Sequence, residues 1–253
     1  MRILSEVGLV FRRQLTLSLR SPAWVVVGLL QPVLYLALFG PLLQPLTGLP
    51  QFPRGDAWQV FVPGLLVMQA IFGAVYVGFG LLADWRSGVL ERLRVTPMRR
   101  FSLLMGRVLH DAVVLVVQSV VLVLVALALG FRAPVPAVLI GLGFMLLVGI
   151  ALAALSYMIA LKVKNEGALA PALNTIGMPV FLLSGILLPL SMAPSWLNAV
   201  AYVNPLRYVV EGMREAMLGD YTAVAVGVGL AVAVATAAVA LLGGIRAFNA
   251  ENA

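Results

Sequence analysis

Only a few side chains in this sequence of 253 residues belong to the types that carry out chemistry. His110 is the single histidine, and it stands beside Asp111 in a pair that could pass protons. Gln118 follows Asp111 by about two helical turns and shares its helical face. Because the pair lies near Arg107 and close to one end of an apolar run, an ion pair with a packing role is favoured over a proton relay.

Other kinds of active site are excluded by composition. The chain has no cysteine, which rules out disulfides, thiolate nucleophiles and cysteine metal sites. Neither of its two lysines, Lys162 and Lys164, follows a glycine, so no G-x-x-x-x-G-K-[ST] loop can hold a nucleotide phosphate. No carboxylate cluster or nucleophile–base pattern indicates an intramembrane enzyme. We therefore predict a protein that is not an enzyme and binds no cofactor or metal itself.

Long apolar runs must position these side chains. The chain is 62% hydrophobic and only 11% charged, which is typical of a polytopic membrane protein rather than a soluble domain. No internal repeat or long linker divides it, so residues 1–253 form one all-α transmembrane domain. Six runs are long enough, at about 20 residues, to cross a bilayer; they are 23–43, 59–83, 105–130, 136–161, 169–189 and 222–243.

The distribution of basic residues predicts the orientation. With six spans and both termini inside, thirteen of the 17 arginines and lysines fall in inner segments and four in outer ones. This bias is the positive-inside pattern, so both termini are expected in the cytoplasm. The net charge of +7 is then a property of membrane topology, and nucleic acid is not expected as a partner.

The segment before the first span, residues 1–22, is predicted to lie as an amphipathic helix in the inner interface, in contact with membrane lipid. One helical face carries apolar side chains and the opposite face carries charges. The alternative is that the segment merely ends the first span. The apolar face comprises Leu4, Gly8, Phe11, Leu15 and Leu19.

Polar side chains inside the spans are candidates for a substrate path, since each is costly in hydrocarbon unless it faces protein or water. They recur on one face of the first span and on one face of the second, and a further pair lies between two prolines of the fifth. Ordinary helix–helix contact is the alternative role for any one of them. The candidates are Gln31, Tyr35, Phe39, Gln69, Gly73, Tyr76, Asn174 and Thr175.

Two connecting segments carry further patterns. The inner loop 84–104 mixes arginines with leucines and valines and predicts a short amphipathic helix that stops near Thr96 and Pro97. Such a helix could dock a cytosolic partner, and a solvated turn that only fixes topology is the alternative.

The outer segment 185–217 contains three prolines, which argue against a continuous span. It predicts two short re-entrant helices, 185–192 and 195–202, and an amphipathic outer helix, 205–217. An ordinary outer loop anchored by aromatic rings is the alternative.

Both segments resemble one family. The stretch from Ser87 to Pro97, SGVLERLRVTP, is similar to the Gly-x-Leu-Glu-x-Leu-x-Val-Thr-Pro motif of the second class of ATP-binding-cassette (ABC) exporter permeases, which includes daunorubicin-resistance membrane subunits. A second match follows in the family's order. It comprises Ser184-Gly185-Ile186, Pro189, Pro194-Ser195-Trp196-Leu197, Asn204-Pro205-Leu206-Arg207-Tyr208 and Arg214.

The resemblance implies partners and roles. Two such permeases, either two copies or a copy with a paralogue, would assemble with two cytosolic ABC ATPase subunits that bind ATP and Mg. The inner loop would be a coupling helix that docks on the ATPase through Gly88, Leu90, Glu91, Arg92, Leu93, Arg94, Thr96, Pro97, Arg99 and Arg100. The outer segment would form an exit cap with Ser184, Gly185, Pro189, Pro194, Trp196, Pro205 and Tyr208.

The expected function is export of an amphipathic drug or lipid-like molecule across a bacterial cytoplasmic (inner) membrane. Arginine outnumbers lysine fifteen to two, which is typical of a G+C-rich bacterial gene. Export of a polysaccharide or lipid-linked glycan by the same architecture is an alternative. A secondary transporter without an ATPase is another, although it would be expected to carry acidic groups near mid-membrane.

Overall fold

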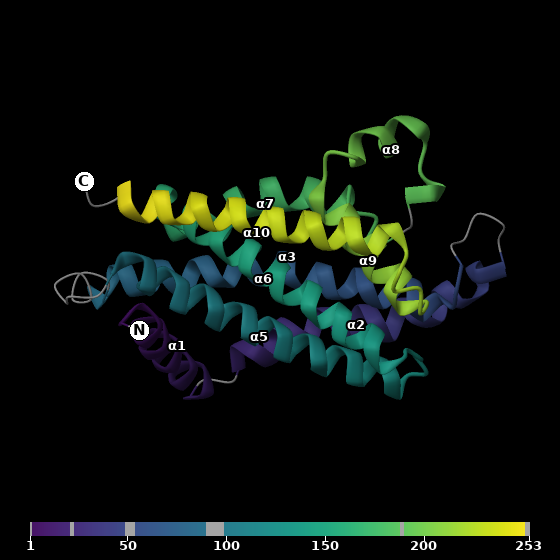
Figure 1. Ribbon diagram of the computed structural model, residues 1–253, viewed down its shortest axis with the longest axis horizontal. Helices are drawn as coiled ribbons and strands as arrows, with labels where there is room; N and C mark the ends of the chain where they lie inside the picture. Colours follow the sequence, from purple (N-terminus) through teal and green to yellow (C-terminus); the bar gives the residue numbers. More distant parts are fainter. Residues whose placement is uncertain (1, 21–22, 49–53, 90–98, 188–189, 251–253) are drawn as a thin grey trace.

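The computed structural model describes residues 2–20, 23–48, 54–89, 99–187 and 190–250, and within these ranges the chain is helical with no strand. The α-helices lie mostly lengthwise in one elongated bundle (Figure 1). Their bounds are α1 Arg2–Arg20, α2 Ala23–Leu43, α3 Ala57–Arg86, α5 Arg100–Ala128, α6 Val135–Val163, α7 Glu166–Leu182, α8 Ser195–Ala201, α9 Pro205–Met217 and α10 Val224–Ala250, with 3-10 turns at Gln44–Gly48 and Leu190–Met192.

Five of these helices are long and apolar enough to cross a membrane. The candidate spans are Val26–Leu43, Ala57–Arg86, Phe101–Ala128, Val135–Val163 and Val224–Phe248. They agree with five of the six predicted runs to within a few residues at most ends. The chain is therefore an all-helical polytopic membrane protein.

The predicted span 169–189 differs from the structure. α7 ends at Leu182 after 17 residues, although apolar side chains continue beyond it. Ser184 Oγ donates to the carbonyl oxygen of Phe181, and Gly185 adopts a φ of 71°, which is the left-handed conformation that commonly follows a helix. The apolar character of the sequence continues through this break, whereas the helix ends there.

Successive long helices run in opposite directions along the bundle (Figure 1). α1, the C-terminal end of α10 and the junction of α6 with α7 lie toward the left end of Figure 1, while α9 and the junction of α5 with α6 lie toward the right. α6 contacts α3, α5 and α10 and so forms the centre of the bundle.

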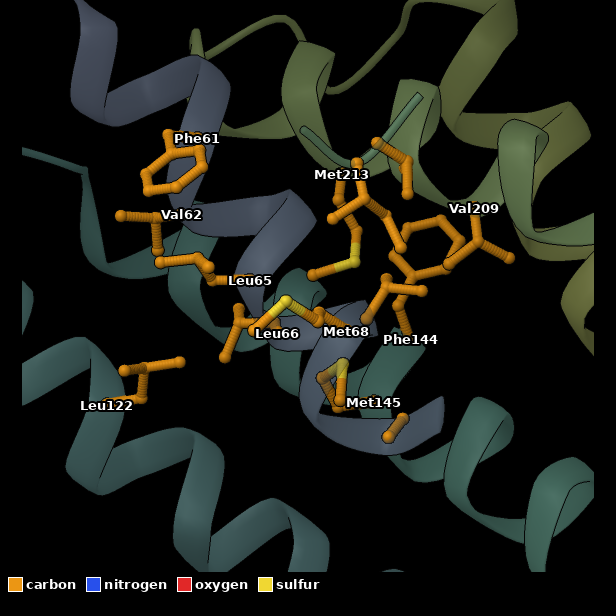
Figure 2. Close-up of a cluster of buried hydrophobic side chains, with 14 of the residues drawn as sticks. Phe61, Val62, Leu65, Leu66, Met68, Leu122, Phe144, Met145, Val209 and Met213 are labelled. Carbon is orange, nitrogen blue, oxygen red and sulfur yellow. The ribbon is translucent and has the colours of Figure 1, made fainter. Parts of the chain in front are cut away.

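The main core draws buried side chains from α2, α3, α5, α6, α7, α9 and α10. Phe61, Leu65 and Met68 of α3 are almost fully buried, and Phe144 of α6 is only 1% exposed. Figure 2 shows these side chains interleaved with Met213 of α9, which lies beyond the central helices. α9 is thus packed into the core through its apolar face, although it is too short and too polar to be a span.

α9 matches the helix predicted over 205–217. Pro205 occupies the first turn, where its missing N–H is harmless, and the Asn204 side chain accepts a hydrogen bond from Leu206 N at 3.0 Å. The bonds of Arg214 hold the helix in place. Its guanidinium donates from Nε to Val60 O at 2.9 Å and from Nη2 to Gly185 O at 2.8 Å.

The environment of Arg214 alters its titration. Burial lowers the pKa of Arg214 to about 10, and the nearby Glu211 carboxylate opposes that shift. Glu211 itself pairs with Arg207, at 2.9 Å between Oε1 and Nε. The sequence spacing alone would also allow Glu211 to pair with Arg214, three residues later, but the structure pairs Glu211 with Arg207.

The N-terminal helix α1 packs against α5. The contact is close because Gly106 has no side chain; a Cβ there would lie 2.6 Å from Val10 Cβ. Glu6, which the helical pattern puts on the charged face, is buried and accepts a hydrogen bond from Arg99 N at 3.1 Å. On the side away from α5, Leu4 and Leu19 are 79% and 73% exposed.

Candidate functional site

A cavity of about 730 Å³ opens between α1, α2, α3, α5 and α6. α3 provides the longest wall, from Gln69 to Asp84, a distance of about 22 Å along a helix that rises 1.5 Å per residue. Most of the lining is apolar, with polar side chains gathered at two levels. The polar lining residues are Gln14, Ser18, Gln31, Gln69, Tyr76, Asp84, Arg107, His110, Asp111, Gln118 and Tyr157.

The first level is a buried ion pair near the end of α3. The side chain of Arg107 is 5% exposed, and its Nη2 donates to Asp84 Oδ2, whose side chain is 23% exposed. A charged group in such a place is costly unless it is paired. The pair therefore permits Arg107 to lie inside the bundle and ties α3 to α5.

At the same level, a second group of polar contacts surrounds His110, one turn further along α5. His110 Nδ1 lies 3.0 Å from Asp111 Oδ1, and Ser18 Oγ of α1 lies 2.9 Å from His110 Nε2. Tyr157 of α6 donates its hydroxyl proton to Asp111 Oδ2. Three helices thus meet at one histidine and one carboxylate, consistent with the ion-pair and packing role that the sequence favours.

The contacts from Ser18 to His110 and from His110 to Asp111 have the connectivity of a hydrolase triad, but among the described residues the site lacks the oxyanion-binding groups of one. Acyl transfer also needs free N–H donors for the developing oxyanion. Ser18 lies inside the continuous helix α1, where backbone N–H groups are taken up by helical hydrogen bonds. In the described part of the chain, no group of three or more histidine, cysteine or acidic residues could hold a metal ion.

The other level of polar side chains lies deeper in the bundle. Gln69 Nε2 donates to Gln118 Oε1 at 3.2 Å, and Gln69 is 2% exposed. Gln69 Oε1 has no hydrogen-bond partner although it is buried and its residue lines the cavity. A buried carbonyl oxygen without a donor is destabilising by roughly 1–3 kcal/mol, so it presents an acceptor to whatever enters.

Several predicted path residues line this cavity. Gln31 of the first span and Gln69, Gly73 and Tyr76 of the second all do so, as does Gly80 on the same face. Asp111 and Gln118, predicted on one face, line it together as well.

Four predicted path residues are not among its lining. Tyr35 stacks on Phe39 at 5.3 Å between ring centroids, and Phe39 lies 6.3 Å from the ring of Phe61, so these rings pack nearer the other end of α2. Asn174 and Thr175 are exposed on α7, where Thr175 Oγ1 donates to Pro171 O at 2.8 Å.

Most of the predicted coupling residues, Leu90 to Pro97, lie outside the described residues. On either side of them, Gly88 follows the end of α3 with a φ of 68°, and Arg99 and Arg100 precede and begin α5.

The predicted cap residues, apart from Pro189, which lies outside the described residues, are distributed over three elements. Ser184 and Gly185 end α7, Pro194 and Trp196 lie at the start of α8, and Pro205 and Tyr208 belong to α9. Trp196 is 68% exposed. The hydroxyl of Tyr208 donates to Tyr202 O at 2.9 Å, which links α9 back to the end of α8.

Sequence reasoning missed several members of the site. Ser18, Asp84, Arg107 and Tyr157 were not among the predicted path residues. A charged or phenolic side chain at the edge of a span is a weak signal, because such groups are common near interfaces. Contacts such as the one between Ser18 and His110, 92 residues apart, are visible only in the fold.

A multi-pass helical bundle with a polar-lined internal cavity and no nucleotide-binding loop defines the membrane part of a transport system. Residues 5–218 match the model of the ABC-2 type transporter family. The chain belongs to this family. It is accordingly a membrane transport subunit, and the ATPase is a separate protein.

Named relatives are similar along most of the chain. A transport permease, ycf38, from Cyanophora paradoxa is 31% identical over 197 residues, which are 77% of this chain and 68% of the relative. The doxorubicin resistance ABC transporter permease protein DrrC of Mycobacterium tuberculosis is 28% identical over 210 residues, 82% of this chain and 75% of the relative. The daunorubicin resistance ABC transporter permease protein DrrB1 of Streptomyces coeruleorubidus is 29% identical over 167 residues, which are 64% of this chain and 58% of the relative.

Replacing the buried acid of the ion pair tests its structural role. We expect Asp84→Asn to lower the free energy of unfolding by about 3 kcal/mol, because Arg107 would remain buried without its counter-charge. The matched control is Glu166→Gln, which removes a carboxylate 3.2 Å from Arg86 in a pair whose side chains are 53% and 38% exposed. The control should cost less than about 1 kcal/mol. Equal small losses in denaturant titrations of the purified permease would contradict the buried pair.

Filling the cavity tests its use in transport. Gln69→Trp should reduce efflux of amphipathic dyes from cells that carry the permease and its ATPase, because a large ring replaces open volume. Co-purification with the ATPase should persist, since Gln69 lies about 25 Å from the end of α3. The control Val117→Trp places the same ring at a residue that is 53% exposed and lies away from the cavity. Loss of co-purification would mean that Gln69 packs helices instead.

Proposed function

We propose that this chain is the membrane-spanning subunit of an ATP-driven exporter that moves an amphipathic drug or lipid-like molecule out of the cytoplasm or inner leaflet. The observation that carries the proposal is the cavity, which extends from the buried ion pair to the Gln69–Gln118 bond. Its mixed lining suits a molecule with a long apolar part and few polar groups. Family membership and the drug-resistance names of DrrC and DrrB1 support the same reading.

The membrane arrangement is proposed to contain six crossings, with α7 as the fifth. α7 has 17 residues, or about 26 Å of helix, slightly less than the usual 30 Å of hydrocarbon. It runs between the same two ends of the bundle as its neighbours (Figure 1), and six crossings bring both termini to one side. The excess of basic residues on that side supports placing it in the cytoplasm, at a bacterial inner membrane.

A second permease, a copy or a paralogue, is proposed to cover α2 and α7. Gln31 and Tyr76 are exposed although both line the cavity at mid-helix, and Asn174 and Thr175 are exposed on α7. Polar side chains at that depth are unfavourable against lipid, so a protein surface is the better neighbour. The same pairing would close the open side of the cavity.

The inner loop 84–104 is proposed to be the coupling helix that docks on two cytosolic ATPase subunits, which bind ATP and Mg. The outer segment 185–217 is proposed to cap the exit. The core-packed α9 supports the cap, because it lies toward the right-hand end of the bundle in Figure 1, and α8 stands outside the bundle on the chain that leads to it.

The orientation can be measured directly, because the native chain has no cysteine. Thr47 and Ser87 are both exposed hydroxyl residues, and they lie at opposite ends of the bundle. We expect an impermeant thiol reagent added to intact cells to label Thr47→Cys and to label Ser87→Cys only after the cells are opened. The reverse result would invert the topology.

Coupling separates the exporter from a stand-alone carrier. A contact that drives a conformational change must differ between the two states. We expect Glu91→Ala, and a break of the loop helix by Leu93→Pro, to leave the spans inserted while cutting transport and transport-linked ATP hydrolysis severalfold. The measurements are ATPase and efflux assays on the permease reconstituted with its candidate ATPase partner.

The control for this experiment is Asp220→Ala, which removes an exposed carboxylate from the connection between α9 and α10. It should transport normally. Undiminished transport in both loop variants, or transport in vesicles that contain no ATPase, would replace the exporter with a secondary carrier.

A further inference from the structure

The charges around the inner part of the cavity do not balance. Asp84 and Asp111 contribute two negative charges, and Arg107 contributes one positive charge. Tyr157 and Ser18 are uncharged hydroxyl donors or acceptors, and no charged residue of α1, α2 or α10 is among the described lining. With a neutral imidazole at His110, the cavity therefore carries a net charge of −1.

This excess charge is located at Asp111. The guanidinium of Arg107 is bonded to Asp84, whereas Asp111 accepts hydrogen bonds from Tyr157 and His110. Hydrogen bonds stabilise a carboxylate, but an ionised group inside a membrane protein is much more stable with a counter-charge. A proton on His110, a proton on Asp111 itself or a cation that enters the cavity can balance this charge.

The geometry around His110 suits either protonation state. When the imidazole is neutral, Nδ1–H donates to Asp111 and Nε2 accepts from the Ser18 hydroxyl, at 3.0 and 2.9 Å. When the imidazole is protonated, Nε2–H donates to Ser18 Oγ instead, because a hydroxyl can act in both ways. His110 can therefore gain or lose a proton without a broken hydrogen bond.

A second, independent feature points to a ligand in the same cavity. Gln69 Oε1 is buried and lacks a donor, and its amide is bonded to Gln118, seven residues beyond Asp111 on α5. Seven residues of helix correspond to about 10 Å. The apolar stretch between the two acceptors includes Val114 and Leu115. The cavity thus offers a carboxylate at one level and a polar acceptor at the other.

We propose that the His110–Asp111–Tyr157 cluster is the recognition site for a monovalent amphipathic organic cation, which binds beside Asp111 in exchange for the proton on His110. Arrival of the cation makes the imidazolium unfavourable, so His110 returns its proton to water and the charge of the cavity stays balanced. The apolar body of the ligand extends toward Gln69. This site lies within one permease subunit, between α1, α3, α5 and α6. It names the substrate class of the proposed exporter and rests on that proposal.

Proton exchange gives the site a pH signature. A cation that competes with a proton for the same site binds more weakly as the pH falls. We expect the apparent affinity to be severalfold lower near pH 5.5 than near pH 8. Loss of affinity on acidification is the direction required, because the protonated state is the one that already has its counter-charge.

The probe is radiolabelled tetraphenylphosphonium, a lipophilic cation, measured against tetraphenylborate, an anion of nearly the same shape. Both are titrated onto the purified full-length permease in nanodiscs, with empty nanodiscs subtracted. The expected result is saturable binding of the cation only, with weaker binding at low pH. Equal binding of the two ions, or binding of the cation that does not change with pH, would overturn the proposal.

Variants locate the effect. Asp111→Asn should weaken cation binding at least tenfold near pH 8, whereas Asp220→Asn, the same change at an exposed position, should have no effect. His110→Gln should still bind the cation, with the pH dependence lost. If Asp111→Asn does not purify as a folded protein, the His110→Gln variant decides the question, and a retained pH dependence in it refutes the exchange.

Failure of this site and failure of the proposed function are distinguishable. Cation binding is measured on the permease without its ATPase, whereas export requires the two together. Coupled export without cation selectivity would remove only the site proposed here. Cation binding by a permease that transports without an ATPase would keep the site and remove the exporter.

Discussion

Polar groups inside a bilayer must find partners within the protein, and in this molecule that requirement falls on one cluster shared by α3, α5 and α6. Arg107 lies in the bundle because its guanidinium donates to Asp84, and Asp111 lies there because Tyr157 and His110 donate to its carboxylate. These bonds fix the separation of three long helices. α1 is added to them through Ser18, so a helix that carries exposed leucines on its outer side is also attached to the cavity wall. Helix order, cavity shape and the position of the N-terminal helix all depend on this network.

The two halves of the bundle are built differently. The half that contains α9 has a dense core in which Phe61, Phe144 and Met213 interdigitate, whereas the half toward α1 encloses open volume lined by polar side chains. Dense packing holds one arrangement of the helices, since side chains in a close-packed core cannot shift without loss of contacts. An open region joined by hydrogen bonds can exchange partners more easily. Within one short bundle, rigidity and adaptability are therefore separated along the membrane normal.

Much of the fold could be predicted because the signals are local. Apolar runs gave five spans, and the proline and asparagine at 204–205 gave the start of α9. The end of α7 could not be predicted from hydropathy, since the turn at Ser184 and Gly185 is made by one hydroxyl bond and one left-handed glycine amid apolar neighbours. For the site, a period of about 3.6 residues correctly put Gln69, Gly73 and Tyr76 on one face. The same rule put Tyr35 and Phe39 with Gln31, although their large rings stack on each other and on Phe61 farther along α2. Contacts between distant segments, such as Ser18 with His110, have no local signal.

The two hydrogen bonds of Arg214 have a mechanical consequence. The guanidinium joins α9 to the carbonyl of Val60 on α3 and to the carbonyl of Gly185 beyond α7, so one side chain links three separate parts of the chain. Pulling any one of them away would strand a charge among buried groups, and hydrogen bonds to charged donors are each worth about 1.5–3 kcal/mol. These parts of α3 and α9 and the chain beyond α7 are therefore expected to move together. Displacement of α3 at this end would carry α9 with it, whereas α8, which stands away from the bundle in Figure 1, is not held by these bonds.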